Sequence, residues 1–197
     1  MAKDKNIKIL GWEKKPKSLV RYLNAGDYFA YQIGEGLYGW GQLLARNDLG
    51  WSAIFFKYLT DNADNFDINN PEQQERLFIT IVDAYRLFQD KSYGDFRIIV
   101  QVKIFDNPYK NEFVSIDGET SSLRNPDFSV TKKISDEEID AIATKKPEVF
   151  ETQRAYDLLI ELLVHYVPEI FKPEHRPFLL EKYLLKVFER KGKPKPF

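Results

Sequence analysis

Four glycines lie close together in the segment IGEGLYGWGQ, and their spacing is that of a phosphate-binding loop. Gly34, Gly36 and Gly39 are spaced as G-x-G-x-x-G, and Gly41 follows two residues later. In a dinucleotide-binding protein this spacing opens a helix whose N-terminal amides hold the phosphate. Here the extended pattern continues through residues 42–45, so the sequence offers no helix N-terminus for an anion.

We therefore expect the glycines to have a structural role. Gly34 and Gly36 are predicted to form a turn between two strands. Gly39 and Gly41 are two residues apart and leave one strand face bare, which allows a strand to bend or a ring to approach closely. A kinase-type loop also lies between two strands and Lys57 follows, but no H-R-D or D-F-G motif is present and the chain is too short.

Metal and nucleophile chemistry has few candidate residues in this chain. There are no cysteines, which excludes disulfides, thiolate zinc sites and a cysteine nucleophile. The two histidines, His165 and His175, form no H-E-x-x-H motif, and no G-x-S-x-G motif is present. These residues form no strong metal-binding or catalytic motif, so residue chemistry alone leaves the activity open.

A metal-dependent nuclease is the least favoured alternative. Gln101 and Lys103 lie on a strong strand pattern, with Asp83 and Asp95 upstream. Some nucleases hold Mg²⁺ with an acid on one strand and steady the attacking water with a lysine on the next. The usual second carboxylate is missing here, so an ordinary polar strand face explains the pattern. The carboxylates of DEEID, residues 136–140, are explained by the dipole of a helix that they open.

Exposed rings and carboxylates are the remaining candidates, and they suit binding rather than catalysis. Trp and Tyr dominate the anchors of protein interfaces, although each single ring is more often a core residue. Acidic residues in TDNADNFD could meet a basic partner, although a solvated loop is the favoured explanation for them. The predicted partner-binding residues are Tyr38, Trp40, Trp51, Asp61, Asp64 and Asp67.

The elements that would position these residues are strands first and helices last. Period-two patterns predict strands in DYFAYQI, LYGWGQLLAR, LFITIV and FRIIVQVKIF, and WSAIFFKYL is a strand with apolar residues on both faces. A strand buried on both faces favours a strongly curved sheet or a small barrel. EFVSI is a further predicted strand, and residues 119–133 are predicted to be a loop.

Helices are predicted for the last third of the chain. Asn70-Pro71 earlier predicts a single helical turn, and Ser135 with Glu138 forms a capping box that opens a short helix. A longer helix over about 152–166 and a final helix near 180–188 follow. The fold class is therefore α+β: a strongly curved antiparallel sheet or small β-barrel followed by a C-terminal pair or trio of helices.

Size and composition agree with this organisation. The chain has 197 residues, 29 Lys plus Arg and 30 Asp plus Glu, and no apolar run long enough for a signal peptide or a membrane span. We expect no membrane partner and no direct nucleic-acid binding. The predicted organisation is an arm over 1–24, a sheet domain over 25–133, helices packed on the sheet over 134–190 and a disordered tail over 191–197.

The stretch AGDYFAYQIGEGLYGWGQLLARNDLGWSAIFFKYL, residues 25–59, resembles the opening of immunity protein family twenty-six of bacterial polymorphic toxin systems. The shared features are a basic, Pro-containing lead (KKPK), Gly26-Asp27, an aromatic pair, a turn, a Gly-bearing aromatic strand and a bulky third strand. A later strand like LFITIV is also expected of the family. The C-terminal helices have no counterpart in the resemblance.

The resemblance implies a protein that binds a cognate toxin in the cytoplasm and blocks it by occlusion. No catalysis or cofactor is then needed, and acidic residues such as Asp61, Asp64 and Asp67 would mimic nucleic acid towards a nuclease toxin. A sheet-barrel interaction module with an aromatic groove for peptide or nucleic acid is the alternative. A toxin gene next to the gene for this chain would support the immunity protein, whereas the interaction module predicts no such neighbour.

Overall fold

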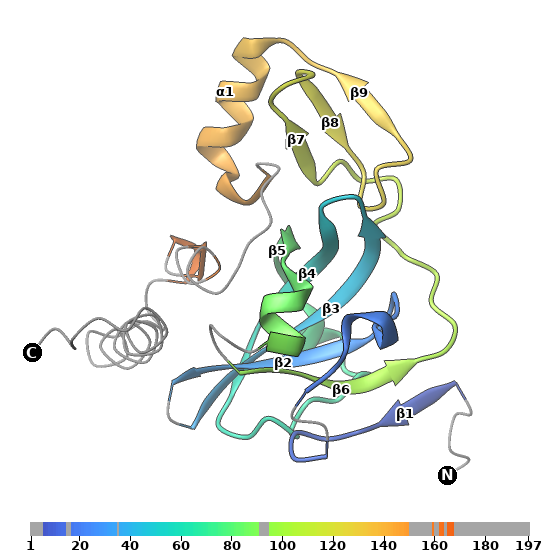
Figure 1. The fold of residues 1–197 in the computed structure, drawn as a ribbon. Coiled ribbons are helices and arrows are strands. Elements are labelled where there is room, and N and C mark those ends of the chain that lie inside the picture. The colour runs from blue at the N-terminus through green and yellow to red at the C-terminus, as the bar shows by residue number, and fades with distance from the viewer. Residues whose placement is uncertain are drawn as a thin grey trace, which may run out of the picture.

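The computed structural model describes residues 6–14, 17–34, 36–90 and 95–149, together with 159, 162, 163 and 165–167. Two antiparallel sheets and a few short helices make up this part of the chain (Figure 1). The α+β class with an antiparallel sheet is thus confirmed. None of the described helices is long and apolar enough to cross a membrane.

The larger sheet has six strands in the order β1-β6-β2-β3-β4-β5, and all of its pairs are antiparallel. Its strands are β1 (Ile7–Ile9), β2 (Tyr28–Gly34), β3 (Leu37–Asn47), β4 (Gly50–Thr60), β5 (Arg76–Val82) and β6 (Phe96–Val102). The smaller sheet contains β7 (Ser115–Asp117), β8 (Ser122–Arg124) and β9 (Thr131–Lys133). It lies beyond one end of the larger sheet, beside α1 (Figure 1).

The helices are short. They are the 3₁₀ turns η1 (Val20–Tyr22), η2 (Pro71–Gln74) and η4 (Pro147–Val149), the π-helix η3 (Tyr85–Asp90) and the α-helix α1 (Asp136–Lys145). The predicted capping box is present, because the Ser135 side chain accepts from the Glu138 amide and the Glu138 carboxylate accepts from the Ser135 amide. Asn70 caps η2, with Pro71 in its first turn, as predicted.

The expectation of a small barrel or strongly curved sheet is wrong. The larger sheet is open, and β1 and β5 are its two edges among the described strands. The double burial of β4 has another cause. One face of the sheet packs on η3 and on Leu159, Leu162 and Leu163, while the other face is covered by Trp12 and by the connection after β4. A sheet covered on both faces needs no closure to bury a strand completely.

The C-terminal helices are only partly within the described residues. Leu159, Leu162 and Leu163 are helical and buried against the sheet, in agreement with the second half of the longer helix predicted over about 152–166. His165 is exposed and lies edge-on to the ring of Tyr166. The predicted final helix, His175 and the tail lie outside the described residues.

Candidate partner-binding site

The glycine-rich segment is a β-hairpin and holds no phosphate cradle. Gly34 ends β2, Gly36 has a positive φ of 65° in the turn, and Gly39 and Gly41 lie inside β3. Between Gly39 and Gly41 the register with β4 moves from Leu59 to Phe55, so four residues of β4 oppose two of β3. The pairing is thus irregular at the glycines, and the extra residues of this bulge lie in β4.

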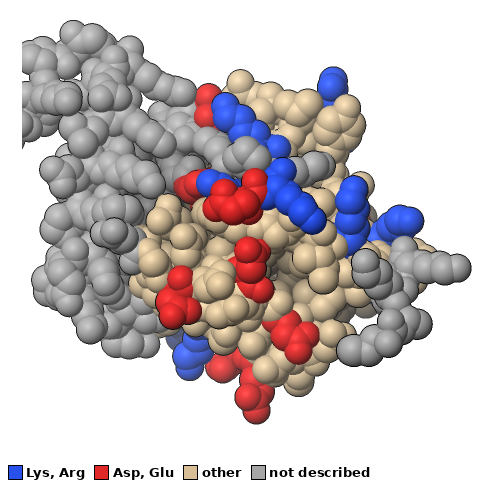
Figure 2. Space-filling view, turned by 90° about the horizontal axis from the view of Figure 1, so that it is seen from below, with Lys and Arg blue, Asp and Glu red and all other residues tan. Residues whose placement is uncertain are grey.

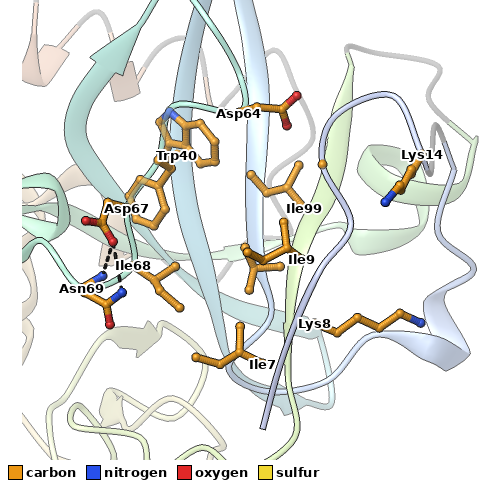
Figure 3. Close-up of a pocket in the computed structure, with 13 residues that line it drawn as sticks. Ile7, Lys8, Ile9, Lys14, Trp40, Asp64, Asp67, Ile68, Asn69 and Ile99 are labelled. Carbon is orange, nitrogen blue, oxygen red and sulfur yellow. Dashed lines mark hydrogen bonds between the residues drawn. The ribbon is translucent and has the colours of Figure 1, made fainter. Parts of the chain in front are cut away.

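A groove of about 840 Å³ lies on one face of the larger sheet, next to the edge strand β1. One wall is formed by the Ile7 and Ile9 side chains, and the opposite wall is formed by Asp67, Ile68 and Asn69 (Figure 3). Ile99 of β6 lies between the walls, and Trp40 lies at one end (Figure 3). Val100 and Phe66 also line the groove. The lining is largely apolar with a few polar groups, which is the composition of a polypeptide- or ligand-binding site.

The wall opposite β1 belongs to the connection between β4 and β5, and an aromatic anchor holds it on the sheet. Phe66 stacks on Trp40 with ring centroids 4.6 Å apart and lies parallel to Phe56 at 5.9 Å. Stacked rings of this kind add to the gain from burial. Asp67 accepts from the backbone and side-chain N–H groups of Asn69 at 2.9 and 3.2 Å, which sharpens the turn at the rim.

The two walls are joined at one end by Asp64. Its Oδ1 accepts a hydrogen bond from the Trp12 amide at 2.7 Å, across 52 residues of sequence. Gly11 has a positive φ of 71°, and a Cβ there would lie 3.3 Å from the same carboxylate oxygen. The close approach of the Asp64 carboxylate to Gly11 therefore fixes the segment that follows β1.

Arg97 of β6 holds the same segment from the other side. Its guanidinium lies 4.2 Å from the centre of the Trp12 ring, donates to the Trp12 carbonyl at 2.7 Å and forms a two-pronged pair with Asp95 at 3.0 and 2.7 Å. The hydrogen bond to Asp95 is the main reason why the pKa of Arg97 lies above its usual value. The groove is thus bounded by fixed rather than loosely held elements.

The structure brings three of the six predicted binding residues together. Trp40, Asp64 and Asp67 line the groove. Tyr38 is half-buried and lies edge-on to Trp12, and Asp61 is exposed on the connection. Trp51 packs in the cluster on the opposite face of the sheet. Trp40 and Trp51 are 1% and 6% exposed, so both are core residues rather than exposed rings.

The sequence prediction missed the apolar wall of the groove. Ile7 and Ile9 flank Lys8 in a period-two pattern, and this pattern was the available signal. Ile68 and Phe66 carry no such signal, because they lie in a connection without periodicity.

The wall opposite β1 has charge of one sign, whereas Lys8 and Lys14 also line the groove. The connection 61–75 contains five carboxylates and no Lys or Arg. Figure 2 views the molecule from below Figure 1 and shows several acidic side chains in the centre and lower part of the surface. Lys8 lies between Ile7 and Ile9 in β1, and its side chain extends in another direction than theirs (Figure 3). A partner surface with positive charge fits this rim.

The nuclease arrangement does not assemble from the residues considered for it. Asp95 is paired with Arg97, and Asp83 is paired with Arg86 at 3.3 Å. Among the described residues no group of three or more His, Asp or Glu side chains is placed to hold a metal ion. Comparisons of the chain with protein-family models, curated proteins and solved structures found no match.

Proposed function

We propose that this protein is an immunity protein, which binds a cognate toxin and blocks it by covering the toxin's active surface. The segment 25–59 that resembles immunity protein family twenty-six makes up β2, β3 and β4, three neighbouring strands of the larger sheet. The observation that carries the proposal is the acidic connection 61–75, anchored beside an open groove by Phe66.

A fixed acidic surface suits the inhibition of a toxin that acts on nucleic acid. Such a toxin must present positive charge to a phosphate backbone, and an acidic protein competes for the same surface. A specific interface buries about 800 Å² on each partner, so the groove and the connection would form part of a wider contact. Occlusion requires no catalytic group and no cofactor on this chain.

The alternative is an interaction module whose groove takes a peptide, without any toxin. The apolar walls of the groove suit a peptide-binding module as well as they suit an immunity protein. The carboxylates at the rim of the groove disfavour a nucleic-acid ligand. The two functions differ in one testable respect. Only an immunity protein restores growth to cells that express the toxin.

The test is co-expression with the candidate toxin domain encoded beside the gene for this chain. Wild-type protein is expected to restore growth and to form a complex whose affinity falls as salt concentration rises. Replacing Asp61→Asn and Asp67→Asn together is expected to weaken the complex by about tenfold, mainly through slower association. The matched control replaces Asp106→Asn and Glu119→Gln, two exposed carboxylates outside the connection. Failure of the wild-type protein to restore growth rules out the proposal.

A further inference from the structure

The outer edge of β1 presents backbone groups that no described residue uses. β1 pairs with β6 so that Lys8 lies opposite Gln101. The Asn6 carbonyl accepts from Lys103 at 2.9 Å, and the Leu10 amide donates to Ile99 at 2.7 Å. In an antiparallel pair, alternate residues direct their N–H and C=O groups towards the partner strand.

The N–H and C=O groups of Asn6, Lys8 and Leu10 therefore point towards β6. Those of Ile7 and Ile9 point in the opposite direction, away from the sheet. A strand edge of this kind is a template for another extended chain.

The side chains of the same two residues mark one face of this edge as a docking surface. Ile7 and Ile9 project into the groove (Figure 3). Ile9 is 74% exposed. An added strand would cover Ile9 with its own side chains on that face, and the burial of apolar surface would favour the complex by about 25 cal/mol for each Å².

The charges define what the added strand should carry. On the groove face the strand would meet the rim of Asp64 and Asp67, within a connection that contains only acidic charges. On the opposite face it would meet Lys8, which is exposed. Lys14 also lines the groove, so positive charge on the added strand is favoured beside Asp67 in particular and disfavoured beside Lys8.

We propose that an extended segment of a partner protein adds to β1 as a further strand. Its backbone pairs with Ile7 and Ile9, and its groove-facing residues are apolar with an arginine or lysine that meets Asp67. The residues that alternate with them are uncharged or acidic. This inference rests on the proposed function, since it names the surface and the chemistry by which the toxin is bound.

The first test uses a synthetic probe and the full-length chain. The peptide Thr-Val-Thr-Arg-Thr-Val-Thr, with both ends blocked, places Val and Arg on one face of a strand. We expect it to bind and to slow amide hydrogen exchange at Ile7 and Ile9 by about tenfold at saturation. The matched peptide with Glu in place of Arg is expected to bind at least about fivefold more weakly. Equal binding of both peptides, or no slowing at these two amides, overturns the inference.

The second test changes the edge itself. Ile9→Pro removes an outward-facing N–H and leaves the bonds to β6 in place, as prolines do on natural edge strands. We expect the affinity for the peptide to fall about tenfold, because the variant loses the hydrogen bond that the N–H of residue 9 donates to the added strand. Ile9→Ala is compared with Ile104→Ala, because both isoleucines are 74% exposed and Ile104 does not line the groove. Only the change at Ile9 is expected to weaken binding.

A third readout does not depend on a proline being tolerated. The chain has no cysteine, so Ile9→Cys and Ile104→Cys each introduce a unique thiol. Bound peptide, or the bound toxin domain, is expected to slow alkylation at position 9 and not at position 104. Equal alkylation at both positions in the complex overturns the inference.

The outcomes separate this inference from the proposed function. If growth is restored but Ile9→Pro and the thiol at position 9 have no effect, the protein is an immunity protein that binds through another surface. If the basic peptide binds at β1 but no toxin is neutralised, the edge is a peptide site and the proposed function is wrong. A dimer of this chain that is abolished by Ile9→Pro, without peptide binding, identifies a second copy as the occupant and overturns the inference.

Discussion

The ring of Phe29 lies across Gly41 of the neighbouring strand and fills the space that a side chain would need. The two residues are directly paired between β2 and β3. A Cβ at Gly41 would lie 2.3 Å from Cζ of Phe29 and 2.5 Å from the Ile54 carbonyl oxygen. Tyr31 covers Gly39 in the same way, with its Cζ atom 2.3 Å from the position of a Cβ. The bare face of β3 is what allows both rings to lie flat on the sheet.

Substitution of Gly41 is therefore expected to destabilise the fold strongly. Gly41→Ala forces a methyl group against both a packed ring and a backbone carbonyl, and overpacking of this kind costs about 1–3 kcal/mol. Gly118→Ala is the control, because a Cβ there meets nothing within 4 Å. Urea unfolding curves of the two variants provide the measurement. Equal midpoints for both would show that the sheet adapts and that the close approach is not required.

The strands β2, β3, β4 and β5 could be predicted from the sequence, because β2, β3 and β5 alternate with period two and β4 is a continuous apolar run that follows a turn signal. The paired glycines were the right signal for the close approach of a ring or a strand. The capping box of Ser135 and Glu138 was equally readable, since it depends only on local spacing.

The path of β6 could not be predicted from its period alone. The pattern places Phe96, Ile98, Val100 and Val102 on one face. In the structure Tyr28 pairs with Val100 and Phe29 with Ile98, so Ile99 is an extra residue in β6. This bulge turns the strand, and Phe96 and Ile98 pack on one side of the sheet while Val100 packs on the other.

The predicted strand EFVSI overlaps β7, whereas β8, β9 and the groove were missed for related reasons. β8 and β9 have three residues each, fall in the segment predicted to be a loop, and have no apolar alternation. Residues of the groove come from β1, β3, β6 and the 61–75 connection, so only the tertiary pairing brings them together. Trp40 and Trp51 were candidates for exposed anchors because residue type alone does not distinguish a core ring from a surface ring.

The segment that follows β1 is expected to need Arg97 to keep its position on the sheet. Arg97→Lys keeps a positive charge but loses the two-pronged pair with Asp95 and the flat stacking on Trp12. We expect a loss of about 1–3 kcal/mol in the free energy of unfolding, since bonds to charged groups are of that size. Amide exchange at Leu10 and Trp12 should become faster than in wild-type protein. Arg21→Lys, at an exposed position, is the control. Unchanged exchange at Trp12 would contradict this role of Arg97.

Asp27 is expected to make stability fall as pH rises. It is fully buried, and desolvation raises its pKa, although the amides of Asn24 and Val102 donate to it at 3.0 and 3.2 Å. The folded chain then holds a proton at this carboxyl more readily than the unfolded chain does. Its contribution to the free energy of unfolding is complete below the ordinary value of 3.8 and is lost as pH rises through the raised pKa.

The variant Asp27→Asn removes this titration and isolates its effect. Asparagine keeps one acceptor oxygen and has an NH2 group in place of the other, so one of the two amides of Asn24 and Val102 loses its acceptor. The variant is therefore expected to be less stable than wild-type protein by about 1–3 kcal/mol. The difference in the free energy of unfolding between wild-type and variant protein should be larger at about pH 3 than at about pH 7. Urea unfolding at the two pH values gives the comparison. A difference that grows with pH would show that the carboxylate, not the acid, is the form that the fold favours.

Tyr166 is expected to secure the described C-terminal residues to the sheet through Glu148. The Tyr166 hydroxyl donates to the carboxylate of Glu148, which is 5% exposed, and Thr80 of β5 donates to the Glu148 carbonyl at 3.0 Å. Burial and the Glu148 carboxylate raise the pKa of Tyr166, so the hydroxyl keeps its proton and remains a donor. Tyr166→Phe leaves a buried carboxylate without this donor and should cost about 1–3 kcal/mol. Tyr85→Phe, at a position that is 54% exposed, should change stability by less than about 0.5 kcal/mol. Thermal unfolding of both variants measures the contrast, and equal transition temperatures would mean that the Tyr166–Glu148 hydrogen bond does not stabilise the fold.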